Sequence, residues 1–423
     1  MLTQSGNDHD QPVLLVSGDS HVGPILETDL RPHCPTDRLD EFDRYASSPA
    51  VATARASFGP PTMLNRKTDG HFDAVARLAD MDADGVAAEV IYHQSFNGEP
   101  IPFQDGGWPN PDHPELATLG FRIYNRWLAE FCAVAPERLI GLAHLPMWDL
   151  DAAIAELEWA ADHGLRGVNF PASRPGWKQY NDPCWEPFWD AAEGRGMVLS
   201  THAGGGIDPA AIEAFPSPLG ILEAGGALNR RPIARMVIGG VFERHPNLKL
   251  AMTEQPGIWV PELLADMDSA QLALGMLNPQ QLSRSPSEYF MDNVFVGASF
   301  IAPFETADAV DKGYWTNLFW GRDYPHPEGT WRYTEEPTDT RMTHLSLRHA
   351  FGAGVAEDIV RAIVGTNAIG VFGLDRDALE KIAASIGPTL GQITEPLPSV
   401  PAPDSEERQG MGLFSFRTVG AWA

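Results

Sequence analysis

Short apolar runs that alternate with longer helical patterns limit the fold of this sequence more than any other feature. Eight runs have the length and the aliphatic or β-branched composition of strands that are buried on both faces. They lie at 13–18, 85–92, 139–145, 165–170, 197–201, 248–253, 293–299 and 317–321. Helical periodicity fills the intervals, at 71–82, 114–135, 150–163, 184–194, 219–244, 257–270, 303–312 and 340–364. Repeated strand–helix units in this number predict an α/β fold, a (β/α)8 TIM barrel.

The length of the chain, 423 residues, fits one such barrel with insertions. Long insertions are expected after the first and second strands, at 22–70 and 94–113, where they would cover the mouth of the barrel. A glycine-rich loop, 203–218, follows the fifth strand. The sequence then becomes rich in proline beyond residue 385. We therefore predict a barrel domain over 1–385 and a flexible tail, or an arm onto a neighbouring subunit, over 386–423.

The charge balance narrows the range of partners. The 30 basic and 57 acidic residues give a formal net charge of −27, which would repel a phosphate backbone, so nucleic acid is not an expected partner. The apolar runs are too short to cross a bilayer, and the polar start of the chain lacks the pattern of a signal peptide. We expect a cytoplasmic protein with no membrane partner. Three cysteines lie far apart and are expected to be reduced thiols: Cys34, Cys132 and Cys184.

Titratable residues lie where the predicted strands end, which is where a barrel of this class builds its active site. Asp19 and His21 follow the first strand two residues apart, a spacing that points both side chains to one side of an extended chain. His202 ends the fifth strand, and Asp323 follows the eighth. Two imidazoles with carboxylates and no thiolate suit an open catalytic site better than a structural zinc site. We predict that these four residues hold one divalent ion, zinc in the first place, with manganese or iron as alternatives.

Other residues at the strand ends are candidates for chemistry or for substrate binding. Glu254 ends the sixth strand. His326 follows Asp323 by three residues, where it could orient that carboxylate, act as an acid or only stack on the turn. We predict catalytic roles for Asp323, Glu254 and His326. Substrate contacts are predicted after the second and fourth strands, at His93, Arg174 and Trp177.

Each of these residues also has an ordinary structural interpretation. An isolated Asp-x-His pair is common by chance, His202 could cap a turn, and Asp323 could cap the helix after it. Three further histidines are interpreted as structural: His144, His163 and His245. The agreement of several strand ends, rather than any one residue, favours the metal site.

Six motifs occur in order along nearly the whole chain. They are SGDSHVGP at 17–24, LRGVNFPAS at 165–173, STHAGGG at 200–206, VFERHPNLKLAMTEQPGIWVPELL at 241–264, WGRDYPHPEG at 320–329 and GTNAIGVFGL at 365–374. Together they resemble the amidohydrolase-related family, in the branch that contains aminocarboxymuconate-semialdehyde decarboxylase and other nonoxidative decarboxylases.

The resemblance implies roles for individual positions. Asp19 and His21 match the first-strand ligand pair of the family, His202 its fifth-strand ligand and Asp323 its eighth-strand aspartate. Asp19 stands where many members have histidine, which resembles decarboxylase members with a carboxylate there. Glu254 stands where many members have a water-activating histidine. It could replace that base, bind the metal or hold neighbouring side chains in place.

These features favour nonoxidative decarboxylation of a small aromatic or unsaturated carboxylic acid, with Asp323 moving a proton at the carbon that loses CO₂. The alternative is hydrolysis of an amide, ester, lactone or C–C bond, with Asp323 or Glu254 accepting a proton from metal-activated water. A barrel that binds a ligand without turnover is a third hypothesis, disfavoured because all four ligand residues are present. We expect a small-molecule substrate and a homo-oligomer, most simply a dimer. Aromatic residues of the insertions would contact the ligand or form the core of a lid: Phe58, Phe96, Phe103 and Trp108.

Overall fold

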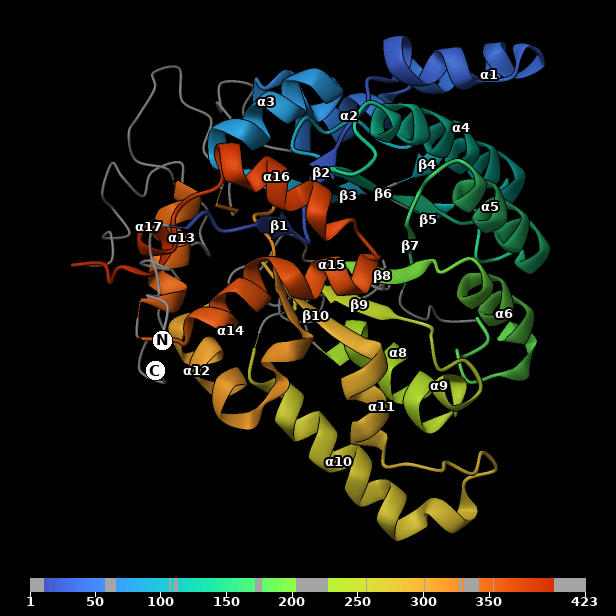
Figure 1. Cartoon of the computed structure of the whole chain (residues 1–423). Helices are drawn as coiled ribbons and strands as arrows, with labels where there is room; N and C mark the ends of the chain where they lie inside the picture. The colour runs from blue at the N-terminus through green and yellow to red at the C-terminus, as the bar shows by residue number, and fades with distance from the viewer. Residues whose placement is uncertain are drawn as a thin grey trace.

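The computed structural model describes residues 11–57, 66–105, 108–109, 113–171, 177–202, 227–255, 257–299, 301–326, 329–330, 342–352 and 354–398. Parallel strands form a nearly closed barrel in the order β1-β3-β6-β7-β8-β9-β10-β11, and helices surround it (Figure 1). The strands are β1 (Leu15–Ser17), β3 (Val86–His93), β6 (Leu139–His144), β7 (Gly167–Asn169), β8 (Val198–His202), β9 (Leu250–Thr253), β10 (Val294–Ala298) and β11 (Leu318–Trp320). A short β2 (His21–Val22) also pairs with β3. The eight predicted strands and the predicted TIM barrel are confirmed.

The first and last strands meet through single contacts rather than through a regular ladder. Gly18 N donates to Trp320 O at 2.7 Å, and Asp323 N donates to Asp19 O at 3.1 Å. A Cβ atom on Gly18 would lie 2.1 Å from the Phe319 ring, so only glycine permits this close approach. The two ends of the barrel sheet therefore meet beside Asp19 and Asp323.

Helices lie outside the strands in the predicted sequence order. They are α3 (Ala74–Asp84), α4 (Pro114–Ala133), α5 (Leu150–Asp162), α6 (Glu186–Gly194), α8 (Ala227–Ile238), α9 (Val241–Arg244), α10 (Trp259–Leu274), α12 (Pro303–Lys312), α13 (Met342–Phe351) and α14 (Glu357–Arg361). The single helix predicted over 219–244 is divided, because Gly240 adopts a left-handed φ of 69° between α8 and α9. Its predicted start lies outside the described residues.

Several short helices were not predicted. They are α1 (Leu39–Ala46), α2 (Pro49–Ser57), α11 (Pro286–Asn293), α15 (Asn367–Phe372), α16 (Arg376–Ile386) and α17 (Leu390–Thr394). Most of these helices have only five to nine residues, and helices this short are stabilised mainly by packing against the barrel.

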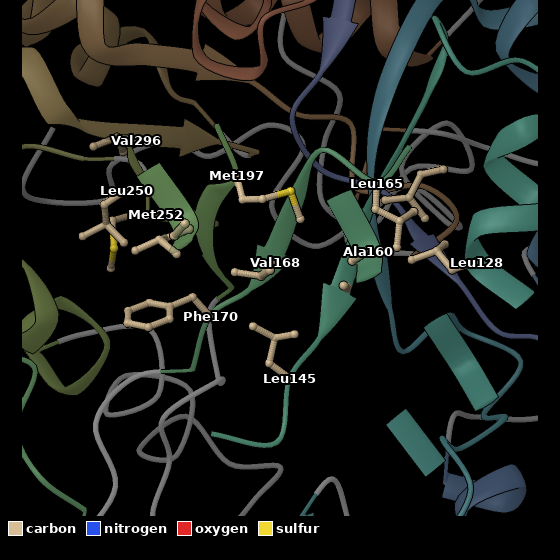
Figure 2. Packing of buried hydrophobic residues seen from close by; sticks show 14 of the residues in the cluster. Leu128, Leu145, Ala160, Leu165, Val168, Phe170, Met197, Leu250, Met252 and Val296 are labelled. Atoms are coloured by element: carbon tan, nitrogen blue, oxygen red, sulfur yellow. The ribbon is translucent and has the colours of Figure 1, made fainter. Parts of the chain in front are cut away.

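Apolar side chains form one layer inside the barrel and another between the strands and the helices. The inner layer includes Val90, Leu142 and Phe319, which are fully buried. Members of the outer layer, among them Val168 and Leu250, lie beside the strands that carry them (Figure 2). Successive residues of a strand point to opposite faces, so the strands supply both layers. This explains why their sequences are continuously apolar.

The two insertions contact each other. The first contains α1 and α2, and the second contains a small hairpin of β4 (Gln104–Asp105) and β5 (Trp108–Pro109). Arg55 of α2 forms ion pairs with Glu27 of the first insertion at 2.7 Å and with Glu99 of the second at 2.8 Å. Phe103 packs against Phe42 and Tyr45, as expected of a lid core. Phe58 lies outside the described residues.

The segment expected to form a tail begins with structure. Leu390 and Ile393 of α17 are fully buried, and Thr389 bridges to Pro12 near the start of the chain. Residues 399–423 lie outside the described residues, and the arm onto a neighbouring subunit stays a prediction, as does the dimer. Within the described residues, no helix combines the length and the apolar composition needed to span a membrane.

Candidate metal centre

The four predicted ligands converge at the carboxyl ends of the strands. Asp19 Oδ1 lies 3.4 Å from His21 Nε2 and 3.4 Å from His202 Nε2. His21 Nε2 lies 3.0 Å from Asp323 Oδ1. Asp19 and His21 follow β1, His202 ends β8 and Asp323 follows β11, so residues some 300 positions apart in the sequence are brought together by closure of the barrel.

Several atoms that face this centre are buried and form no hydrogen bond with the described part of the chain. Within the described residues, Asp19 Oδ1, His21 Nε2 and both carboxylate oxygens of Asp323 are buried and accept or donate no hydrogen bond. Burying such groups costs free energy unless another partner binds them. Two carboxylates and two imidazoles that converge in this way fit one divalent metal ion.

The remaining atoms of the ligands are held by the barrel. Ser299 Oγ, after β10, donates to Asp19 Oδ2 at 2.5 Å. His21 Nδ1 lies 2.8 Å from the carbonyl oxygen of His93. Because a carbonyl can only accept, Nδ1 carries the proton and Nε2 presents a lone pair to the centre. His21 is therefore held in the tautomer that a metal ligand needs.

His326 lies against two of the four ligands. Its ring stacks on His21 with centroids 4.1 Å apart and 9° between the planes. Its Nδ1 lies 3.2 Å from Asp323 Oδ1, and its Nε2 lies 2.9 Å from the carbonyl oxygen of Gln94. Both ring nitrogens face oxygen acceptors, an arrangement that suits a doubly protonated imidazole. The structure thus places His326 where it can orient Asp323.

Glu254 lies at the edge of the centre. Its Oε2 is 3.7 Å from His202 Nδ1, and one of its oxygens lies within 4.8 Å of oxygens of Asp19 and Asp323. Glu254, Asp323 and Gln94 have left-handed φ values of 55°, 54° and 77°. Each follows a barrel strand. Such a conformation costs a non-glycine residue about 1–3 kcal/mol and is concentrated at functional sites.

The two aspartates are held in the charged state. Burial alone would raise the pKa of Asp19, but His202 and His21 hold that pKa well below its ordinary value. Burial would likewise raise the pKa of Asp323, but His326 and His21 hold it below the ordinary value despite repulsion from Asp19. Ionised carboxylates are the form that binds a cation.

A buried ion network that sequence reasoning missed supports the loop of Asp323. Arg322 donates to Glu89 at 2.9 Å and to Asp84 at 3.0 Å, and Arg77 donates to Glu89 at 2.6 Å. Arg77 also donates to the carbonyl oxygen of His21. Both arginines and Glu89 are fully buried. The available signal was a lone glutamate inside the apolar run VAAEVIYH, because a charge is rarely buried in a strand without a partner.

The three predicted substrate contacts have different surroundings in the structure. His93 ends β3 beside the centre, and its ring packs against His144, at the end of β6, with centroids 5.9 Å apart. His144, interpreted from the sequence as structural, therefore lies at a strand end next to a site candidate. Trp177 is half-buried and packs against the main hydrophobic core. Arg174 lies outside the described residues. Roles in substrate binding stay predictions for all three proposed residues.

The two other histidines have structural surroundings. His163 stacks on Trp159 with ring centroids 4.0 Å apart, at the end of α5. His245 Nε2 lies 3.1 Å from Glu186 of α6. Both positions lie away from the strand ends that carry the four ligands.

Comparisons with known proteins agree with the fold and with the landmarks of the site. The amidohydrolase family model matches residues 19–374. A gamma-resorcylate decarboxylase from Rhodococcus jostii (strain RHA1) is 28% identical over 201 residues, which cover 45% of this chain and 60% of that protein. A 2-amino-3-carboxymuconate-6-semialdehyde decarboxylase from Dictyostelium discoideum is 27% identical over 188 residues, 44% of this chain and 48% of that protein. The matches thus span about half of each of these relatives.

Two solved structures share the fold. The 5-carboxyvanillate decarboxylase of Sphingomonas paucimobilis superposes with a TM-score of 0.60 at 23% identity, over 86% of this chain and 100% of that one. A dihydroxybenzoic acid decarboxylase from Polaromonas sp. JS666, with bound manganese and the inhibitor 2-nitroresorcinol, gives a TM-score of 0.57 at 18% identity over 86% of this chain and 98% of that one.

Proposed function

We propose, from the premise that the chain belongs to the amidohydrolase family, that it is a metal-dependent enzyme that removes CO₂ from a small aromatic carboxylic acid without oxidation. One observation carries the metal dependence: the buried ligand atoms of Asp19, His21 and Asp323 converge with His202 and form no hydrogen bonds of their own within the described residues. The donor set suits zinc and manganese, and the sequence alone favours zinc. Manganese is supported by its presence in the Polaromonas structure.

Asp19, His21, His202 and Asp323 would hold the ion. A divalent ion bound by these residues would supply a Lewis acid that stabilises negative charge on the substrate. The protein supplies the proton. Asp323, ionised in the resting site, would first take a proton from His326 and then deliver it to the ring carbon; the electron pair of the C–C bond would return to the ring as CO₂ leaves. His326, 3.2 Å from Asp323 Oδ1, would orient the carboxyl group and restore its proton.

The substrate class is supported by the relatives and by the surroundings of the site. The relatives compared above include decarboxylases of a resorcylate, a carboxyvanillate and a dihydroxybenzoic acid. In this chain, Phe96 of the second insertion lies edge-on to His326 with ring centroids 6.2 Å apart. An aromatic side chain beside the centre favours a flat apolar ring as ligand.

Hydrolysis is the second candidate, because one specific residue favours it. Glu254 holds a carboxylate within 4.8 Å of oxygens of Asp19 and Asp323, where it could accept a proton from an attacking water. The two reactions differ in the source of the new atoms in the product. Decarboxylation adds a proton, whereas hydrolysis adds oxygen from water.

Manganese- or zinc-loaded protein is incubated with a panel of hydroxylated benzoic acids, and separately with their amides and esters, in water enriched in ¹⁸O. The proposal predicts release of CO₂ and a phenol whose ring oxygens are unlabelled. Product that carries ¹⁸O, with no CO₂, would establish hydrolysis instead. Asp323→Asn should abolish CO₂ release while the protein stays folded.

A further inference from the structure

A group of polar atoms lies on the side of the mouth away from the aspartates. His144 and Asn169 are partners in the register of β6 and β7, and Asn169 and Ser200 are partners in that of β7 and β8. Partners in register on parallel strands point to one face of the sheet. Ser200 bonds to the Tyr92 hydroxyl inside the barrel, so that face is the interior. His144 and Asn169 therefore face the mouth of the barrel.

The tautomer of His144 follows from its contact with Asn169. Asn169 Nδ2 lies 3.3 Å from His144 Nε2. An amide nitrogen can only donate, so Nε2 accepts and the proton of the neutral ring is on Nδ1. Burial lowers the pKa of His144 to about 3, which keeps the ring neutral at pH 7. Within the described residues, no protein acceptor is found for the Nδ1 proton.

Two further polar atoms beside His144 have no hydrogen-bond partner in the part of the chain that the structure describes. His93 Nε2 and the Tyr124 hydroxyl are buried and form no hydrogen bond within the described residues. The Tyr124 ring lies 5.1 Å from that of His93 and 5.2 Å from that of His144, measured between centroids. His93 Nε2 can form one hydrogen bond, as donor or as acceptor according to the tautomer of the ring. A buried hydroxyl without a partner is uncommon in folded proteins and points to a missing third group.

Three atoms, His93 Nε2, the Tyr124 hydroxyl oxygen and His144 Nδ1, could together bind a hydroxyl group. A hydroxyl donates one hydrogen bond and accepts up to two. It could donate to His93 Nε2 and accept from Tyr124 or from His144 Nδ1. Phe121 closes the group, with its ring 5.3 Å from His144 and 5.5 Å from Trp148, so an aromatic ring would carry that hydroxyl into apolar surroundings.

The group also adjoins the metal centre. The carbonyl oxygen of His93 binds His21 Nδ1 at 2.8 Å, and the next residue, Gln94, binds His326 through its own carbonyl oxygen at 2.9 Å. The backbone of His93 and Gln94 therefore links the group to the metal centre.

We propose that His93, Tyr124 and His144 form a subsite that binds a ring hydroxyl of the substrate, on the part of the ring remote from the carboxylate that reacts. The inference rests on the proposed function for its substrate class and names a further requirement of that substrate. The acid would carry a hydroxyl group meta or para to the carboxylate. Loss of such a bond lowers affinity by about tenfold when the partner stays buried.

The test measures binding, so that it does not depend on turnover. Benzoate, 3-hydroxybenzoate and 4-hydroxybenzoate are titrated by calorimetry into manganese-loaded wild type, Tyr124→Phe, His144→Phe and the control Tyr180→Phe. Tyr180 donates to the Pro171 carbonyl oxygen at 2.5 Å and is not part of the group. Tyr124→Phe removes a hydroxyl that has no partner among the described residues, so its melting temperature should equal or exceed that of wild type.

The wild type and Tyr180→Phe should bind one of the hydroxylated acids about tenfold more tightly than benzoate. In Tyr124→Phe and His144→Phe, the affinities for that acid and for benzoate should differ by no more than about twofold. A wild type without the preference, or a preference that survives both substitutions, overturns the subsite. Release of CO₂ is measured separately. If the wild type shows the preference and the two variants lose it, but no CO₂ is released, the result contradicts the proposed reaction and still supports the subsite.

Discussion

His326 stacks on His21 with ring centroids 4.1 Å apart and also reaches Asp323 Oδ1 at 3.2 Å through its Nδ1. One imidazole outside the predicted ligand set therefore supports two members of that set. Loss of a group that orients a metal ligand typically lowers metal affinity or activity by about 10- to 100-fold.

Replacing His326 by asparagine is expected to lower the rate of CO₂ release by about 10- to 100-fold, because Asp323 loses the group that orients it. Steady-state kinetics on metal-loaded protein measure this. His163→Asn, which alters a histidine stacked on Trp159 away from the centre, is the matched control and should keep the wild-type rate. An unchanged rate in His326→Asn would remove His326 from the mechanism.

Glu89→Gln is expected to destabilise the fold by about 3–5 kcal/mol, because it leaves Arg77 and Arg322 buried without their shared carboxylate. Urea unfolding measures the change in the free energy of unfolding. The control is Glu41→Gln, which breaks an exposed pair with Arg38 and should cost at most about 1 kcal/mol. Equal losses in the two variants would show that the buried network does not stabilise the loop of Asp323.

The lowered pKa of His144 predicts that the protein loses stability in mild acid. Its pKa is about 3 in the folded chain because of burial, and near 6.5 when unfolded. Between these values the unfolded state binds one more proton, so the free energy of unfolding falls as the pH falls from 6.5 toward 3. The contribution is about 1.4 kcal/mol per pH unit.

Unfolding by urea at several pH values from 6.5 to 4 tests this expectation. The free energy of unfolding should change less steeply with pH in His144→Phe than in wild type, by about 1.4 kcal/mol per pH unit, which corresponds to one proton. His163→Asn serves again as control, because His163 stacks on Trp159 at the end of α5 away from the centre, and its slope should match wild type. Identical slopes in His144→Phe and wild type would show that His144 is already protonated in the folded protein.

The repeated strand–helix pattern was sufficient to predict the barrel, because strands buried on both faces leave continuous apolar runs that sequence alone displays. Asp19, His21, His202 and Asp323 could be found because a barrel of this class collects its strand ends at one face. The position of a residue along a strand was therefore enough to predict that these four would meet.

Contacts between different helices, strands and insertions could not be predicted from the sequence in this way. Phe96 and Phe103 belong to one insertion, yet Phe96 faces His326 and Phe103 packs in the lid. His144 was interpreted as structural from the sequence. Its contact with Asn169 depends on the register of β6 and β7, which the sequence does not show. Short helices such as α17 depend on packing rather than on their own periodicity.

The metal content of the purified protein tests the central claim most directly. Elemental analysis should find one zinc or manganese ion per chain in wild type and less than about a tenth of that in Asp19→Asn and in His202→Ala, because each removes a ligand from a single site. Glu41→Gln, far from the centre, should retain the full content. A wild type that carries no stoichiometric divalent metal, and that releases CO₂ equally well after chelation, would contradict the account.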